Sequence, residues 1–214
     1  MTTGRIARGS YPPRSNWLTV AVSTRYPRLA SALGGELFQA LLGGYLARGP
    51  VESRESQERG GRLVDFLAEH ADDYPVWYAD LARLDRACED VATAPVVPRL
   101  ERQDLAYERP IRLVPASTLV EIATSAHEAW TALARGQEPK QPRELDWPQT
   151  VLMWRDDQLA VYLRPVGLTE AAALRSARRG TSIVELAGGF GCADPLARAT
   201  ELVVSWTDLG VLAR

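Results

Sequence analysis

The two histidines of this sequence are its best candidates for acid–base chemistry or metal binding, and they lie far apart. His70 follows an apolar stripe and is expected at the end of a helix, partly buried. His127 precedes Glu128, and we expect both on the exposed face of another helix. A zinc or iron site needs three or four ligands. Neither histidine has a second ligand at suitable spacing, so we expect no metal site and no cofactor in this chain.

The nucleophilic side chains are equally isolated. Cys88 lies on an apolar helical stripe, where a free thiol behaves as a small hydrophobic residue. Cys192 is expected at an exposed turn between helices, with no His or Lys nearby to lower its pKa. Lys140 lies in a segment rich in proline and charge, which is a poor setting for Schiff-base chemistry. None of these residues predicts a covalent catalyst.

Phosphate-binding and hydrolase motifs are also missing. The sequence contains no P-loop, no G-x-G-x-x-G and no G-x-S-x-G pattern. Its richest glycine cluster, residues 188–191, follows a predicted helix instead of opening one, which is typical of a helix stop. The sequence therefore predicts no catalytic residues, and we expect the chain not to be an enzyme by itself.

A short basic run, Arg175, Arg178 and Arg179, is open to three interpretations. It could contact DNA phosphates, or it could meet an acidic peptide. It could also complement the dipole at a helix C-terminus, which its position just before Gly180 favours. The net charge of −2 and the pI near 5.8 argue against a general affinity for nucleic acid or anionic membranes.

The composition is that of a globular protein of one or two domains. The 214 residues are 46% hydrophobic and 24% charged, which supplies enough apolar material for a core. No stretch approaches the roughly 20 apolar residues of a membrane helix. The N-terminus has no apolar signal segment. We therefore expect a cytoplasmic protein.

Helical periodicity dominates the first part of the chain. Apolar residues recur every three or four positions, most regularly between Trp77 and Val91. Such stripes can be buried only against each other, so residues 17–92 should form a helical bundle. Short strands are expected near Leu113 and Leu119, followed by a helix from Ala126 to Arg135.

The pattern changes after residue 149. Two β-rich runs, 150–154 and 159–163, flank a polar segment and predict a hairpin. Three short helices should follow. The first ends at Gly180, the second starts at Thr181, and the third starts at Asp194-Pro195. Two strands followed by three helices indicate a winged-helix-like module.

We therefore predict a mainly α (α+β) fold, with an N-terminal helical bundle followed by a small winged-helix-like module that carries a β-hairpin. The predicted organisation is a flexible tail (1–16), a helical-bundle domain (17–135), a linker (136–149) and a winged-helix-like peptide-recognition domain (150–214).

Several short motifs occur in an order that resembles the HvfC/BufC family of MbnC/TglI-like partner proteins. The resemblance covers most of residues 22–212, and Asp80-Leu81-Ala82-Arg83-Leu84-Asp85 is its most specific part. It implies a partner of a TIM-barrel enzyme with a multinuclear non-haem iron centre, and the pair would modify cysteine in ribosomally made peptides. The iron would belong to that enzyme. The other motifs are Arg25-Tyr26-Pro27, Gly35-Glu36-Leu37-Phe38 with Tyr45-Leu46, Asp65-Phe66-Leu67 and Trp154-Arg155.

The C-terminal residues resemble a second family, the PqqD-type peptide-recognition elements. After two strands come residues 168–174, residues 180–186 and a helix ending at residues 209–212, in the order of those elements. The resemblance implies binding of a leader peptide by strand addition to an open sheet edge. Either hairpin strand could be that edge, and the third helix has more apolar surface than three short helices need. The residues expected to bind the leader are Leu152, Trp154, Arg155, Val161, Leu163, Leu202, Val203 and Trp206.

Taken together, the residues and the two resemblances predict a non-catalytic partner subunit. It would bind the leader of a precursor peptide and form a heterodimer with the iron enzyme, without binding nucleic acid or membranes. The alternative is a DNA-binding transcriptional regulator.

Overall fold

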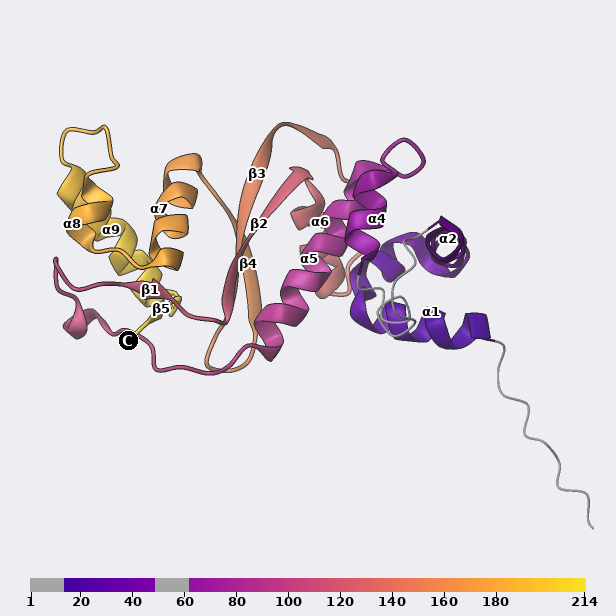
Figure 1. The fold of residues 1–214 in the computed structure, drawn as a ribbon, viewed down its shortest axis with the longest axis horizontal. Helices are drawn as coiled ribbons and strands as arrows, with labels where there is room; N and C mark the ends of the chain where they lie inside the picture. The colour runs from indigo at the N-terminus through magenta and orange to yellow at the C-terminus, as the bar shows by residue number, and fades with distance from the viewer. Residues whose placement is uncertain (1–13, 49–61) are drawn as a thin grey trace, which may run out of the picture.

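A central antiparallel sheet separates two groups of helices (Figure 1). The computed structural model describes residues 14–48 and 62–214. Within them are eight α-helices, a three-stranded sheet and a two-stranded sheet. The protein therefore combines helices and strands and is mostly helical, as the sequence predicts. Every helix in the described residues is too short or too polar to span a bilayer.

Four helices precede the sheet and pack into one core with it. Helix α2 is kinked at Gly34, whose φ of 70° favours glycine. The predicted tail (1–16) overlaps the first helix, and residues 1–13 lie outside the described residues. The four helices are α1 (Arg14–Arg25), α2 (Pro27–Arg48), α4 (Leu63–Glu69) and α5 (Val76–Thr93).

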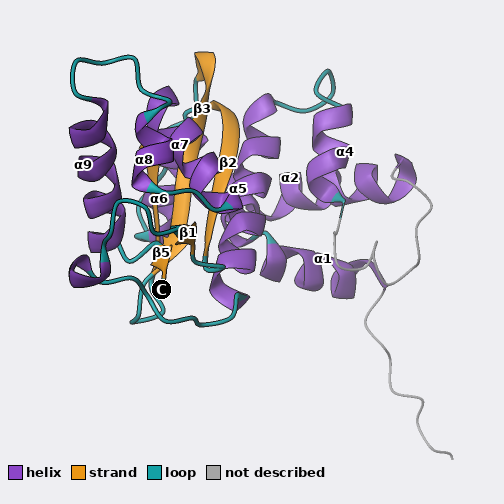
Figure 2. Ribbon diagram, turned by 60° about the vertical axis from the view of Figure 1, so that its left-hand side comes forward, coloured by secondary structure: helices purple, strands orange, loops and turns teal. Residues whose placement is uncertain are grey.

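The central sheet contains the predicted hairpin and one additional strand. Its order is β2-β3-β4, with β2 (Ser117–Thr124) and β4 (Val161–Val166) on either side of β3 (Glu144–Arg155). Helix α6 (Ala126–Ala134) connects β2 to β3. Figure 2, in which the sheet is turned toward the viewer, shows β2 beside β3 and next to α5.

The predicted linker and domain division differ from the structure. Strand β3 begins at Glu144, so residues 144–149 belong to the sheet and not to a linker. Both sheets join residues on the two sides of the predicted linker, because β2 pairs with β3 and β1 (Arg112–Leu113) pairs with β5 (Leu212–Ala213). The hairpin is therefore part of a shared sheet and not a separate wing. Residues 144–149 are exposed or half-buried, which explains why their sequence looks like a linker.

The last three helices follow the hairpin in the predicted order. They are α7 (Leu168–Arg179), α8 (Ile183–Ala187) and α9 (Pro195–Asp208). Ser182 and Glu185 form a capping box at the start of α8, and the Asp194 side chain accepts a hydrogen bond from the amide of Ala197 at the start of α9. These polar residues set where the short helices begin.

The strands alternate between two cores. Val151 and Met153 pack with the N-terminal helices, whereas Leu152 and Trp154 pack with the C-terminal helices. This is the alternation that the sequence predicts for the strand. Residues 150–155 are all buried, so β3 has helices against both of its faces. Over residues 150–155, a partner can therefore reach the sheet only at an edge.

Two buried aspartates of α5 connect the N-terminal elements. The Oδ2 atom of Asp80 accepts hydrogen bonds from the amides of Ala123 and Thr124, each at 2.9 Å, at the end of β2. Asp85 Oδ2 accepts from the amides of Arg28 (2.9 Å) and Leu29 (3.1 Å) at the start of α2. The most specific motif of the family resemblance therefore has a structural role in this chain.

Candidate functional site

Most residues predicted to bind a leader peptide lie in the interior. Leu152, Val203 and Trp206 have no exposed surface, and Leu202 is 8% exposed. Together with Trp154 they belong to the core that the C-terminal helices share with the sheet. The structure thus brings these residues together, but as packing and not as an open groove. The apolar surface of α9 is covered within this core, whose other side chains come mainly from α7, α8 and the sheet.

Arg155 is also buried, and its role is to cap a helix. Its guanidinium donates one hydrogen bond to the carbonyl of Ala92 and another, of 2.8 Å, to the carbonyl of Ala94. These carbonyls lie at the C-terminal end of α5, where a positive charge complements the helix dipole. Only Val161 and Leu163 of the predicted peptide-binding residues keep partial exposure.

Trp206 takes part in a polar network beside β4. Its Nε1 donates to Glu170 Oε1 at 3.0 Å, and Arg164 Nη1 donates to the other carboxylate oxygen at 3.0 Å. Burial alone would raise the pKa of Glu170, but the hydrogen bonds from Arg164 and Trp206 outweigh it, and the pKa is lowered. Glu170 therefore holds β4, α7 and α9 together as a carboxylate.

The outer edge of β4 is the open edge of the hairpin. Within the described residues β4 pairs only with β3, since β3 is the middle strand. Opposite residues of an antiparallel pair of strands alternate between hydrogen-bonded and non-hydrogen-bonded pairs. The Asp156 amide donates to the Ala160 carbonyl at 2.9 Å, so residues 156 and 160 form a hydrogen-bonded pair. By that alternation the backbone groups of Tyr162 face β3, and those of Val161 and Leu163 face outward. Pro165 also faces outward but has no N–H to donate.

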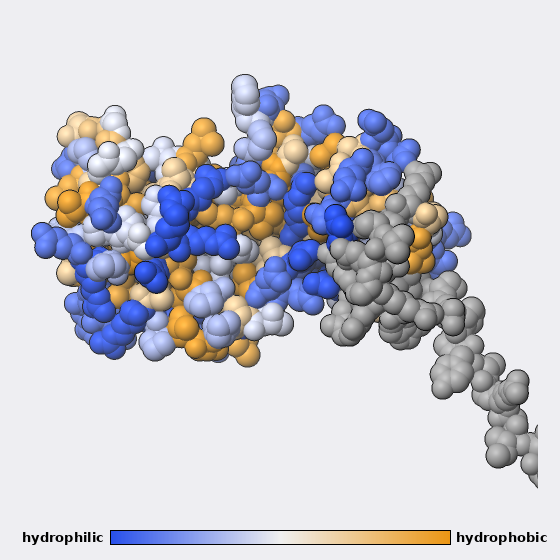
Figure 3. Space-filling view, in the orientation of Figure 1, coloured by the Kyte–Doolittle hydropathy of each residue, from blue (hydrophilic) through white to orange (hydrophobic). Residues whose placement is uncertain are grey.

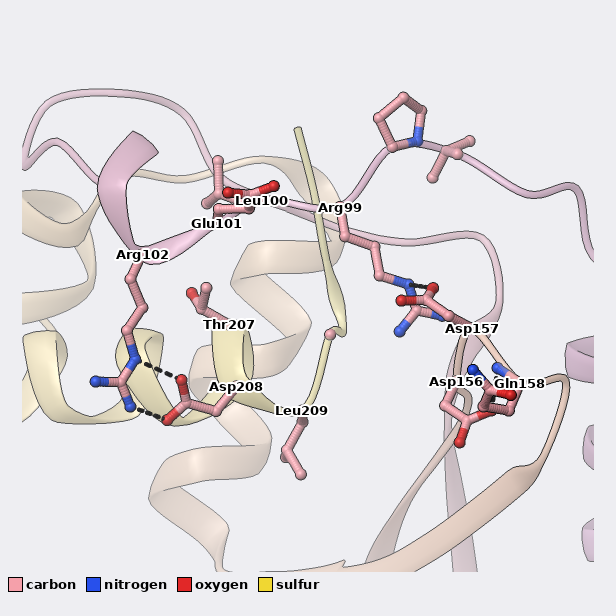
Figure 4. A pocket seen from close by; sticks show the side chains of 13 residues that line it. Arg99, Leu100, Glu101, Arg102, Asp156, Asp157, Gln158, Thr207, Asp208 and Leu209 are labelled. Carbon is pink, nitrogen blue, oxygen red and sulfur yellow. Dashed lines mark hydrogen bonds and ion pairs between the residues drawn. The ribbon is translucent and has the colours of Figure 1, made fainter.

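A hollow of about 740 Å³, here called the hairpin hollow, lies at the start of β4. Three segments form it: residues 97–102, the hairpin turn at 156–158, and the end of α9 at 207–210. Figure 4 shows Arg102 and Asp208 on one side of it and the Arg99–Asp157 pair on the other. The sequence predicts a polar segment at the hairpin turn, but nothing in it indicates that these three segments lie together.

Both arginines of the hairpin hollow are already paired. Arg102 Nε donates to Asp208 Oδ1 at 2.6 Å, and a second bond joins the same two side chains. Arg99 Nε lies 2.8 Å from Asp157 Oδ1, and Arg99 Nη2 donates to the Arg155 carbonyl at 2.6 Å. Four carboxylates and these two guanidinium groups line the hairpin hollow, which leaves an excess of two negative charges.

The two remaining carboxylates of the hairpin hollow have neutral partners. Glu101 accepts a hydrogen bond of 2.8 Å from Gln103 Nε2. Asp156 accepts bonds of 2.8 Å from the amides of Gln158 and Ala160. Desolvation would raise the pKa of Asp156, but these hydrogen bonds and one from Tyr162 lower it overall. Neither carboxylate has an ion-pair partner in the described part of the chain.

A second, smaller hollow of about 230 Å³ lies across the Arg99–Asp157 pair. Its walls are mainly apolar and come from residues 95–97, Val114, Ala116 and Leu159. Val96 is 80% exposed and Leu159 is 67% exposed. Figure 3 shows hydrophobic surface along the lower edge of the molecule, where the hairpin turn and the chain that follows α5 lie.

The histidines and cysteines do not converge on a site. His70 caps α4 and is half-buried, as predicted, with Nδ1 2.9 Å from the Phe66 carbonyl oxygen. His127 is half-buried instead of exposed, and burial lowers its pKa. Cys192 is exposed, as predicted, and Cys88 is half-buried. No group of three or more His, Cys, Asp and Glu side chains in residues 14–48 and 62–214 is arranged to hold a metal ion.

The basic run on α7 is partly engaged within the molecule. Arg175 pairs with Glu121 of β2 and donates to Thr150 Oγ1 at 3.2 Å. Arg178 and Arg179 lie in the last turn of α7, just before Gly180, where they complement the helix dipole. This arrangement agrees with the interpretation that the sequence position favours.

No protein-family model matches the chain, and a search of curated proteins finds no match. The site must therefore be interpreted from its own geometry. Outward-facing backbone groups, a charged hollow and an apolar hollow supply hydrogen bonds, charge and apolar surface, which are the means by which proteins bind an extended polypeptide.

Proposed function

We propose that the protein is a non-catalytic partner subunit that binds the leader of a ribosomally made precursor peptide. Its cytoplasmic partner would be a TIM-barrel non-haem iron enzyme, as the HvfC/BufC resemblance implies, and the iron would be held by that enzyme. The observation that supports peptide binding best is the outer edge of β4, where Val161 and Leu163 direct backbone groups away from the sheet. An added strand would use these groups.

Most residues that the sequence predicts to bind the leader are buried, so the proposed mode of binding uses the edge of β4 instead. The leader would pair with β4 and would leave the core residues Leu152, Val203 and Trp206 in place. Its side chains would alternate between the two sides of the sheet edge. On one side they would meet Val161 and Leu163, and on the other Tyr162, which is 46% exposed and stacks on Trp154.

The DNA-binding alternative has weaker support. Arg175, the first residue of the basic run, is paired with Glu121, and the two remaining arginines form only a short cationic segment. Specific DNA binding requires neutralisation of several phosphates. The excess charge in the hairpin hollow is negative, which disfavours nucleic acid there.

The test of strand addition uses Leu163→Pro compared with Leu163→Ala. Both variants lose the leucine side chain, but only proline removes the outward N–H, and neither disturbs the bonds that Tyr162 makes to β3. Peptides selected by wild-type protein from a phage library of random sequences serve as probes, and fluorescence anisotropy measures their affinity. We expect Leu163→Pro to bind about tenfold more weakly than Leu163→Ala.

Glu121→Pro is the matched control on the opposite edge. Glu121 faces outward from β2 by the same alternation, and its side chain is exposed. Affinity should be unchanged in this variant if β4 receives the peptide. Equal affinities of Leu163→Pro and Leu163→Ala, both with intact circular dichroism spectra, would exclude strand addition at β4.

A further inference from the structure

The open edge of β4 is too short to account for selective peptide binding by itself. Val161 and Leu163 each offer an outward donor and acceptor, whereas Pro165 offers only a carbonyl. A few main-chain hydrogen bonds carry little information about sequence. Selectivity must come from side-chain contacts near the ends of this short edge.

The hairpin hollow adjoins the first residues of β4. Asp156, which lines the hairpin hollow, also accepts hydrogen bonds from the Ala160 amide and the Tyr162 hydroxyl. It therefore belongs both to the hollow and to the beginning of the strand. The hairpin turn, residues 156–158, thus connects the hairpin hollow to the start of β4 and its first outward-facing residue, Val161.

The charges of the hairpin hollow favour a cation over an anion. Asp208 and Asp157 already balance the charges of Arg102 and Arg99, so an acidic side chain would add to the negative excess of the hairpin hollow. A basic side chain would instead reduce this negative excess, and it could bind without displacing either arginine. The hydrogen bonds to Glu101 and Asp156 given above come from neutral donors, so a guanidinium or ammonium group would add charge-assisted hydrogen bonds there.

We infer that the hairpin hollow receives a lysine or arginine side chain of the bound peptide, located just beyond the segment that pairs with β4. The inference rests on the proposed function and specifies the chemistry of its ligand. At about 740 Å³ the hairpin hollow has room for such a side chain together with neighbouring peptide backbone. Glu101 and Asp156 supply the charge that attracts it, and the paired arginines hold the remaining carboxylates in place.

The experiment compares wild type with the double variant Glu101→Gln/Asp156→Asn. Both substitutions retain hydrogen-bond acceptors and remove charge, and circular dichroism checks the fold. Each protein selects peptides from the same phage library of random sequences. Synthetic copies of the wild-type-selected peptides are then made with every lysine and arginine replaced by glutamine. Fluorescence anisotropy at low salt gives the affinities.

We expect lysine and arginine to be enriched at one end of the peptides selected by wild type. Replacing them with glutamine should weaken binding to wild type about tenfold and should have little effect on binding to the double variant. Selected peptides without basic enrichment, or equal losses in both proteins, would overturn the inference, while Leu163→Pro would still report strand addition. If wild type enriched no peptides over a protein-free surface, both this inference and the proposed function would be wrong.

Discussion

On each side of the central sheet a carboxylate accepts a hydrogen bond from a tryptophan ring nitrogen and pairs with an arginine. In the N-terminal core, Asp85 Oδ1 accepts from Trp130 Nε1 at 3.1 Å and pairs with Arg28. On the other side Glu170 combines with Trp206 and Arg164 in the same way. The two triads share their chemistry but differ in depth.

Depth determines what each triad does. The Asp85 side chain is fully buried, receives two backbone amides in addition, and joins α5 to α2 and α6. The Glu170 side chain is 15% exposed. Burial raises the pKa of Asp85 despite its hydrogen bonds, whereas hydrogen bonds lower the pKa of Glu170 despite burial. The same three residue types thus form a structural junction in the core and a more adjustable one beside the candidate site.

The largest effect is expected for Asp85→Ala. The change leaves the Trp130 ring N–H and the amides of Arg28 and Leu29 without their acceptor inside the core. We expect the free energy of unfolding to fall by about 3–5 kcal/mol, as when one partner of a buried pair is removed. Urea unfolding measures it, and Asp90→Ala, an exposed change on the same helix, is the control. Similar stabilities of the two variants would contradict the role given to Asp85.

A smaller effect is expected for Glu170→Gln, because the amide still offers one oxygen to Trp206, although Arg164 loses the charge and one of its two acceptor oxygens. We expect a loss of about 1–2 kcal/mol near neutral pH. The folded-state pKa of Glu170 is lowered, so the contribution of its charge is complete above the unfolded pKa of about 4.3 and is lost as pH falls through the folded value.

The pH dependence distinguishes the two triads. Wild type and Glu170→Gln should therefore differ in stability at neutral pH and converge in acid, when urea unfolding is measured across this range. For Asp85 the pH dependence of stability has the opposite sign, because its folded-state pKa is raised. Its contribution to stability is complete below the unfolded pKa and is lost as pH rises through the folded pKa. A stability gap for Glu170→Gln that stayed constant down to low pH would show that charge is not what Glu170 contributes.

The sequence predicted elements whose signals are local. The stripe from Trp77 to Val91 became α5, Gly180 ends α7, and Asp194-Pro195 begins α9. Hydrophobic period, helix stops and caps act within a few residues, so they can be recognised without knowledge of the fold. The alternation of side chains along a strand is local in the same way, and Leu152 and Met153 lie on opposite sides of the sheet.

Features that depend on distant pairing could not be predicted in the same way. Strand β2 pairs with β3, which follows α6 in the chain, and the residues of neither strand indicate which segment is the partner. The apolar surface of α9 is evident in the sequence, but a stripe that is buried in a core has the same pattern as one that lines a groove. The sequence therefore assigns Leu202, Val203 and Trp206 to peptide binding, whereas the structure buries them. The hairpin hollow combines three separate segments and has no local signature.

The smallest effect is expected for Asp208→Asn, which breaks an arginine–carboxylate pair at the surface. Arg102 and Asp208 bond through two pairs of atoms, as Arg164 and Glu170 do, but their side chains are 66% and 45% exposed. Water and salt screen an exposed pair, and each free side chain regains mobility. The midpoint of urea unfolding should therefore match wild type, whereas Glu170→Gln lowers it. Arg102→Gln should behave as Asp208→Asn does. A midpoint lowered as far as in Glu170→Gln would show that exposure is not what separates the two pairs, and that the end of α9 depends on its contact with residues 102–104.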